Sequence, residues 1–148
     1  TFEAEGITPK LFQYNLVKRA IEHRKHIVLP EGNDERIIRA VSRLLEMDVV
    51  AISVIGNKKQ IESKVLELGL FFDFSKVQII NPIESEHFDD YVNTYYELRK
   101  AKNVTIEMAK DLMEDVSYFG TMMVYKGHAD GMVSGAAHTT QHTILPAL

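Results

Sequence analysis

The chain has 148 residues, of which 45% are hydrophobic and 26% are charged, and its formal net charge is −4. These proportions are typical of a globular domain with its own core, and the acidic balance argues against a general nucleic-acid binder. The absence of cysteine excludes disulfides, thiolate ligands and a protein thiol nucleophile. No apolar run approaches the ~20 residues that span a bilayer, and no signal-peptide pattern opens the chain. We therefore expect a cytoplasmic protein with no membrane partner.

The beginning of the chain predicts a lead-in, a helix and a strand. Residues 1–6 are acidic and aperiodic, which is typical of a linker or of the tail of a preceding domain. Thr8 and Pro9 fit the cap and the first position of a helix that reaches about His23. A short apolar strand follows at 26–30 and is stopped by its proline.

Strands and helices then alternate as far as residue 134. The predicted strands cover 49–55, 76–80 and 130–134, and apolar stripes at helical spacing cover 37–45, 61–68, 88–98, 105–113 and 117–125. Leu66 and Leu98 belong to two of these stripes. Strands joined by helical crossovers run parallel. The fold class is therefore predicted to be α/β, with three αβα layers around a mostly parallel sheet.

The most informative loop follows the last predicted strand. Ligands of such sheets bind beyond the carboxyl ends of the strands. The loops at those ends are 30–34, 56–58, 81–84 and 134–140. Ser134, Gly135 and Ala136 allow a ligand to approach the backbone, and Thr139 and Thr140 add hydroxyls where a new helix is expected. Free N–H groups and the helix dipole favour a phosphate there. The same residues also fit a plain N-cap, in which a threonine serves its own helix.

Two further side chains could contact a ligand. His138 could donate a hydrogen bond to a phosphate or a carbonyl, or could pack within its own loop. Arg99 follows Tyr95 and Tyr96, and its guanidinium fork suits phosphate, although a solvated arginine at a helix C-terminus fits equally. The acidic turn at 31–34 is interpreted as a helix start. The chain contains neither HExxH nor a glycine-rich nucleotide fingerprint, so we expect no metal held by the protein.

The order of four segments is more specific than any single residue. These segments are VLPEG at 28–32, YELRK at 96–100, YFGTMM at 118–123 and ADGMVSGAAHTT at 129–140. Together they resemble the phosphate acetyltransferase (phosphotransacetylase) family, and the resemblance runs from about residue 7 to residue 148.

The resemblance implies a reversible transfer of an acetyl group between coenzyme A and inorganic phosphate in a ternary complex. Coenzyme A or acetyl-CoA is then a substrate, and no cofactor is permanently bound. The implied catalytic domain is a homodimer of two α/β subdomains with an isocitrate/isopropylmalate dehydrogenase-like fold and a cleft between them. Residues 7–148 would be the first part of that domain, truncated at its C-terminal end. The catalytic base and its partners would lie in the later half, so this piece alone is expected to be inactive.

The resemblance also assigns residues to the substrates. It places Ser134, Gly135, Thr139 and Thr140, with His138 beside them, at the acetyl phosphate, and it gives Arg99 a role in substrate binding.

Two departures from the family pattern leave alternatives open. Gln141-His142 stands where an Ala-Asp pair is usual, and Leu145 stands where an arginine commonly precedes Pro-Ala-Leu. Loss of a charge-assisted phosphate contact costs about 1.5–3 kcal/mol. The alternatives are a noncatalytic acetyl-CoA-sensing domain, like the one attached to malic enzymes, and a phosphate butyryltransferase.

Overall fold

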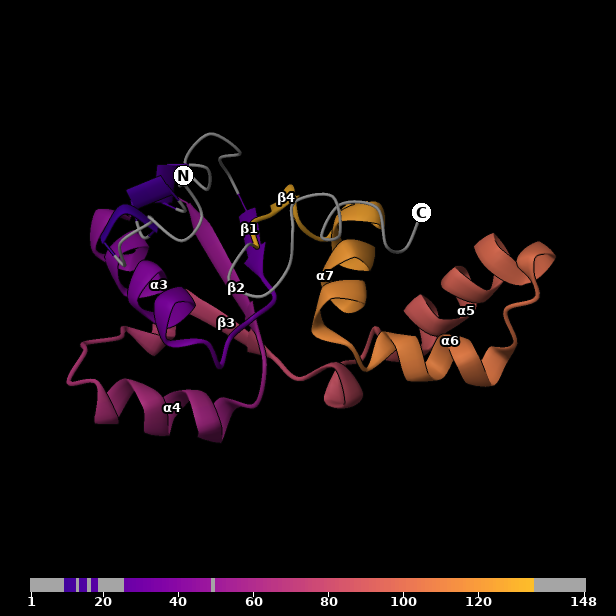
Figure 1. The fold of residues 1–148 in the computed structure, drawn as a ribbon, viewed down its shortest axis with the longest axis horizontal. Helices are drawn as coiled ribbons and strands as arrows, with labels where there is room; N and C mark the ends of the chain where they lie inside the picture. Colours follow the sequence, from indigo (N-terminus) through magenta and orange to yellow (C-terminus); the bar gives the residue numbers. More distant parts are fainter. Residues whose placement is uncertain (1–9, 13, 16, 19–25, 49, 135–148) are drawn as a thin grey trace.

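A four-stranded parallel sheet forms the middle layer of the molecule (Figure 1). The computed structural model describes residues 10–12, 14–15, 17–18, 26–48 and 50–134, and the first seven of these are helical. The strands are β1 (His26–Leu29), β2 (Ala51–Ile55), β3 (Val77–Ile80) and β4 (Gly131–Met132). Their order in the sheet is β3-β2-β1-β4, and every pairing is parallel. The predicted parallel α/β fold is confirmed.

Helices cover both faces of this sheet. They are α3 (Glu35–Met47), α4 (Lys58–Glu67), α5 (Phe88–Arg99), α6 (Ile106–Met113) and α7 (Val116–Tyr125), and short 3-10 turns cover Phe74–Lys76, Pro82–Glu84 and Lys100–Lys102. The helices α3 and α4 pack with one set of strand residues, and α5, α6 and α7 pack with the other. Figure 1 shows α7 between the sheet and the α5–α6 pair. The three-layer arrangement is therefore confirmed.

The first core is aliphatic and follows the helical stripe read from the sequence. Ile37, Ile38, Val41, Leu44 and Leu45 of α3 are all buried. They share one cluster with Ile27, Leu29, Ile52 and Val54 of the central strands and with Ile61 and Val65 of α4. Each fully buried side chain of this size contributes about 1.5–3 kcal/mol, which explains why the stripe determines how α3 docks.

The second core is aromatic and contains methionines. Tyr91 of α5 is fully buried, and its ring centroid lies 4.8 Å from that of Phe119 on α7. Its hydroxyl lies 2.5 Å from Nδ1 of His128, in the segment between α7 and β4. Burial raises the pKa of the Tyr91 phenol, so this tyrosine is neutral at physiological pH and can donate to the imidazole. The second core thus ties α5 to the chain that leads into β4.

Some boundaries and burial expectations were wrong. The strand predicted over 49–55 begins at Ala51, and the strand predicted over 130–134 covers only Gly131–Met132. The side chains of Leu66 and Leu98 are 82% and 42% exposed, although both were placed in apolar stripes. Leu66 directly follows the buried Val65 and therefore points to a different side of α4, and Leu98 lies in the last turn of α5. Among the described residues, no helix is long and apolar enough to cross a membrane.

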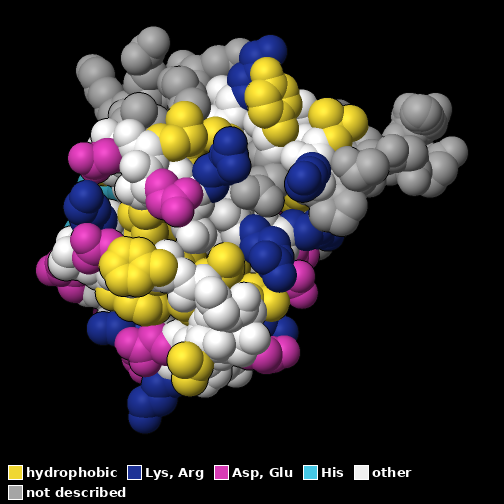
Figure 2. Space-filling model, turned by 90° about the vertical axis from the view of Figure 1, so that its left-hand side faces the viewer, with side chains coloured by type: hydrophobic (Ala, Val, Ile, Leu, Met, Phe, Trp, Pro, Cys, Tyr) yellow, Lys and Arg dark blue, Asp and Glu magenta, His cyan; other side chains and the backbone are white. Residues whose placement is uncertain are grey.

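The outer face of the layer formed by α3 and α4 carries side chains of several kinds. In Figure 2 hydrophobic, basic and acidic side chains are interspersed on this face of the molecule. Leu66 and Phe71, at 82% and 79%, are the most exposed of the large hydrophobic side chains that the structure describes. Single exposed apolar side chains of this kind are usual on protein surfaces.

Candidate functional site

The loops at the carboxyl edge of the sheet are tied to one another by hydrogen bonds. The N–H of Gly56, just after β2, donates to the carbonyl of Ile80 at 2.8 Å. The N–H of Gly32, after β1, donates to the carbonyl of Ile55 at 3.1 Å. Each loop therefore begins with its backbone fixed against the end of the neighbouring strand, which gives this edge a defined shape.

Gly32 occupies a position that accepts no side chain. A Cβ built there would lie 2.6 Å from the carbonyl oxygen of Ile55 and 2.6 Å from Cγ1 of Val54. Two residues later, the side chain of Asp34 caps α3 by accepting from the N–H of Arg36 at 2.8 Å. The prediction that this acidic turn starts a helix is confirmed, and the glycine lets the turn lie directly on β2.

A buried pair of polar side chains joins β1 to β4 at the same edge. Ser134 Oγ donates a hydrogen bond to Oε1 of Glu31 at 2.7 Å, and the two residues are 0% and 5% exposed. The sequence interpretation singled out Ser134 but treated Glu31 as part of an ordinary acidic turn. The available signal was its position between the buried strand β1 and a glycine, where a solvated carboxylate is not expected.

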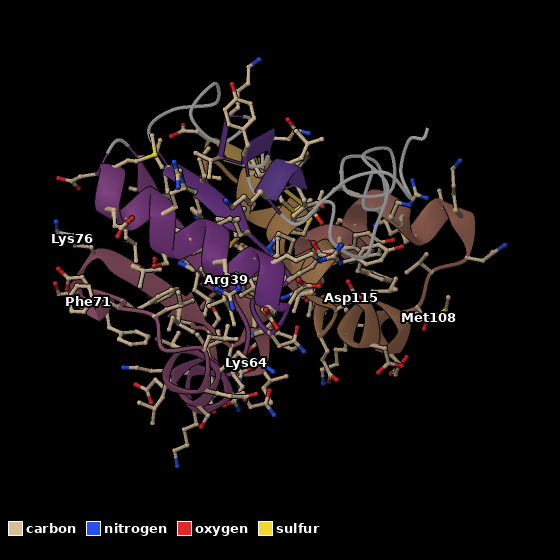
Figure 3. The ribbon with its side chains drawn as sticks, turned by 60° about the vertical axis from the view of Figure 1, so that its left-hand side comes forward. Arg39, Lys64, Phe71, Lys76, Met108 and Asp115 are labelled. Carbon is tan, nitrogen blue, oxygen red and sulfur yellow. The ribbon has the colours of Figure 1, made fainter. Side chains whose placement is uncertain are left out.

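Helix α7 packs against the ends of the strands that lead to this pair. A Cβ on Gly120 would lie 2.8 Å from Sδ of Met132, 3.2 Å from Cδ1 of Ile55 and 3.7 Å from Cβ of Pro30. The glycine therefore lets α7 lie close to the central strands. The side chain of Asp115, labelled in Figure 3, caps this helix by accepting from the N–H groups of Ser117 and Tyr118.

Arg99 lies at the C-terminal end of α5. Its Nε is shielded from solvent, so the residue is not the fully solvated arginine of the alternative interpretation. Burial raises the pKa of the nearby Tyr118, the charges of Tyr95 and Asp115 add to that rise, and the Arg99 guanidinium opposes it. Both β4 and α5 contact α7.

The remaining predicted site residues lie outside the described residues. These are Gly135, His138, Thr139 and Thr140, and the departures at Gln141, His142 and Leu145 lie there too. The described part of the site is therefore its base: the ends of β1 and β4, Gly32, Glu31 and Ser134.

A groove lies at the edge of the sheet opposite to β4. A shallow groove of about 250 Å³ is lined by the end of β3 and by the segment that leads into α5, including Gln78, Asn81, Ser85 and His87. Because β3 and β4 are at opposite edges of the sheet, this groove is separate from Ser134. Within the described part of the chain, no group of three or more acidic or histidine side chains could hold a metal ion.

Comparison with a family model assigns the chain to a protein family. The family model described as phosphate acetyl/butaryl transferase matches residues 11–148. The chain belongs to this family. A phosphate acetyltransferase of Synechocystis sp. is 51% identical over 148 residues, which are 100% of this chain and 21% of the relative. A phosphate acetyltransferase of Corynebacterium glutamicum is 45% identical over 141 residues, which are 95% of this chain and 42% of the relative.

Solved structures agree with this assignment. The EutD phosphotransacetylase from Staphylococcus aureus superposes with a TM-score of 0.74 at 41% identity, covering 95% of this chain and 42% of that structure. A phosphotransacetylase from Streptococcus pyogenes gives a TM-score of 0.74 at 38% identity, with the same coverage of 95% and 42%. The chain thus spans between about a fifth and two-fifths of the proteins it matches.

Proposed function

We propose that the full-length protein containing this chain is a phosphate acetyltransferase, which moves an acetyl group reversibly between coenzyme A and inorganic phosphate. The observation that supports this most strongly is the 51% identity over the whole chain to a protein named phosphate acetyltransferase. Residues 7–148 are then the first part of the catalytic domain, and residues 1–6 are a linker or a domain lead-in. The homodimer remains a prediction from the resemblance, and the cytoplasmic location remains a prediction from the composition.

The proposed reaction is a direct transfer in a ternary complex. In the direction of acetyl-CoA synthesis, a base takes the proton of the coenzyme A thiol, and the sulfur attacks the carbonyl carbon of acetyl phosphate. The carbon–oxygen bond to phosphate then breaks, and phosphate leaves with the electron pair. Developing negative charge on the carbonyl and phosphate oxygens needs hydrogen-bond donors fixed in advance. The base and the groups that hold this charge are expected beyond residue 148.

The part of this chain that serves the reaction is its phosphate side. We assign the segment that begins at Ser134 to the acetyl phosphate, with Gly135, Thr139 and Thr140 as donors and His138 beside them. Its support is the position of Ser134 at the carboxyl end of β4, next to the central strand β1, where ligands of parallel sheets bind. We assign Arg99 to substrate binding as well, because its Nε is shielded from solvent and a guanidinium forms strong charge-assisted hydrogen bonds with anions.

A direct assay tests this proposal. The full-length protein, given acetyl phosphate and coenzyme A, should form acetyl-CoA and release phosphate in equal amounts, and it should run the reverse reaction when the substrates are exchanged. A parallel assay with butyryl-CoA measures the preference for acyl chain length. A folded full-length protein that transfers no acyl group in either direction would contradict the proposal.

Two variants test the assignment of residues. Thr139→Ala should raise the KM for phosphate, and Arg99→Ala should raise the KM for one of the two substrates, each by about tenfold or more if a charge-assisted contact is lost. Lys100→Ala, a change at the exposed neighbour of Arg99, is the matched control and should leave both KM values unchanged. Equal effects of Arg99→Ala and Lys100→Ala would remove Arg99 from the site.

A further inference from the structure

A buried carboxylate lies at the base of the proposed phosphate site, where an anion is expected to bind. Glu31 is 5% exposed, and its described partner is the hydroxyl of Ser134, 103 residues away in the sequence. A carboxylate is costly to bury unless hydrogen bonds compensate its lost hydration. The hydrogen bond from Ser134 compensates part of this cost, and it joins the segments that follow two adjacent strands.

We propose that Glu31 is a positioning residue of the transferase, which holds Ser134 in place and thereby fixes where the phosphate-binding segment begins. This inference rests on the proposed function. It differs from the assignment carried by the resemblance, because Glu31 acts on the substrate through Ser134 and not by touching it.

The Glu31 end of the pair is itself held firmly. The N–H of the next residue, Gly32, is bonded to Ile55 of β2, and the N–H of Asp34 donates to the Glu31 carbonyl at 3.0 Å. Gly32 lies so close to β2 that a Cβ would overlap the Ile55 carbonyl. Because the backbone on its C-terminal side is fixed in this way, Glu31 presents its carboxylate to β4 from a defined place.

The Ser134 end follows a short strand. Strand β4 has only two residues, and after it the N–H of Val133 donates to the carbonyl of Val28 at 3.0 Å. The next residue is Ser134, whose hydroxyl bonds to Glu31. This bond therefore extends the contact between β1 and β4 by one residue beyond the backbone ladder, as far as the start of the proposed site.

The direction of the hydrogen bond limits what Ser134 can do. A serine hydroxyl has one hydrogen to donate, and the hydrogen of Ser134 is directed at Glu31. A phosphate oxyanion accepts hydrogen bonds, so the same hydroxyl cannot donate to Glu31 and to phosphate at once. Ser134 is thus expected to support phosphate binding through its position and not through its hydroxyl hydrogen.

A set of four full-length proteins tests this proposal against the wild type: Glu31→Ala, Glu31→Gln, Ser134→Ala and the Glu31→Ala/Ser134→Ala double variant. Two measurements are made on each, the steady-state kcat and KM values and the rise in melting temperature that inorganic phosphate produces. Ligand-induced stabilisation reports phosphate binding without requiring catalysis.

A positioning role predicts a specific pattern. Glu31→Ala should lower kcat/KM for phosphate about tenfold to a hundredfold and reduce the phosphate-induced shift, while KM for acetyl-CoA changes little. Glu31→Gln should retain most of the activity, because its amide oxygen can accept from Ser134. Ser134→Ala should resemble Glu31→Ala, and the double variant should be no worse than either single variant, since both remove the same bond.

Ser42→Ala is the matched control. Ser42 is also a buried serine with a side-chain hydrogen bond, to the carbonyl of Phe71 at 3.2 Å. It lies on α3 and has no part in the Glu31–Ser134 contact. Its loss should lower the melting temperature without changing either KM. If Glu31→Ala does not fold, Ser134→Ala and Glu31→Gln, which change the volume of the site least, decide the test.

Three outcomes would overturn the proposal. The first is a Glu31→Gln variant as impaired as Glu31→Ala, which would mean that Glu31 acts through its charge. The second is a multiplication of the two single losses in the double variant, which would mean that the residues act separately. The third is a phosphate-induced shift that is equal in wild type and Glu31→Ala, or absent from both. A wild type that binds phosphate but transfers no acetyl group would defeat the proposed function, and the phosphate-induced shifts of the variants would still decide the role of Glu31.

Discussion

The loops after β1 and β2 use the same backbone device and serve different purposes. In both, a glycine N–H donates to the last residue of the neighbouring strand, and a polar side chain then caps the following helix, Asp34 for α3 and Asn57 for α4. Four residues, 30–33, separate β1 from its cap, whereas only Gly56 separates β2 from its cap. The longer loop uses its extra length to carry Glu31 to β4. In both loops the glycine hydrogen bond fixes the loop against the neighbouring strand. Only the longer loop has residues left to place a side chain, Glu31, against Ser134.

The largest expected difference between the two loops concerns their glycines. Gly32→Ala should destabilise the protein by about 3 kcal/mol or more, because the new methyl group would meet a backbone carbonyl that cannot move away. Gly56→Ala should cost about 1 kcal/mol, because its nearest neighbour is Cδ1 of Ile61 at 3.1 Å, the end of a flexible side chain. Urea unfolding of the full-length variants measures both. Equal losses of unfolding free energy in the two variants would show that Gly32 is packed no more closely than Gly56.

The two helix caps are expected to have similar effects on stability. Asp34→Ala and Asn57→Ala each remove a side chain that accepts from a backbone N–H, at 2.8 Å and 3.0 Å, and each should cost about 1 kcal/mol. Activity should separate them. Asp34 closes the loop that carries Glu31, whereas Asn57 lies outside that loop, so only Asp34→Ala, through the loosened loop, should raise the KM for phosphate. Equal KM values in the two variants would contradict the functional difference between the loops.

The smallest effects are expected on the exposed faces of the helices that follow. Arg39 pairs with Glu35 on α3 at 3.1 Å, and Lys64 pairs with Glu67 on α4 at 3.8 Å; both basic residues are labelled in Figure 3. Arg39→Ala and Lys64→Ala should each cost no more than about 0.5 kcal/mol, because solvent screens exposed pairs. Thermal unfolding at low and high salt measures this contribution. A larger loss from Arg39→Ala would mean that α3 is held from its outer face as well as by its buried stripe.

Much of the fold could be predicted because local patterns and tertiary packing agree. The apolar spacing from Ile37 to Leu45 predicted the buried face of α3, and the apolar run at 49–55 predicted a strand, which the structure has at Ala51–Ile55. Thr105 and Asp34 marked helix starts that the structure confirms. Leu66 and Leu98 show the limit, because an apolar side chain that fits a helical stripe can still lie outside the buried face.

Of the two residues in the buried pair, the sequence pointed to one and not to the other. Ser134 was singled out correctly as a residue at the carboxyl end of a strand, because the order of strands and helices already implies that edge. Glu31 was missed, because an acidic residue before a helix has an ordinary explanation in its own neighbourhood. Its partner lies 103 residues away, and no local pattern connects the two.

The sequence by itself therefore determined the elements, the parallel sheet and the family, since these follow from periodicity, crossover connections and motif order within short stretches. Only the tertiary structure decided that β4 lies beside β1, that Gly32 rests against the end of β2 and that a buried carboxylate meets Ser134. The physical reason is that burial and hydrogen bonding are properties of neighbours in space, and these neighbours are distant along the chain.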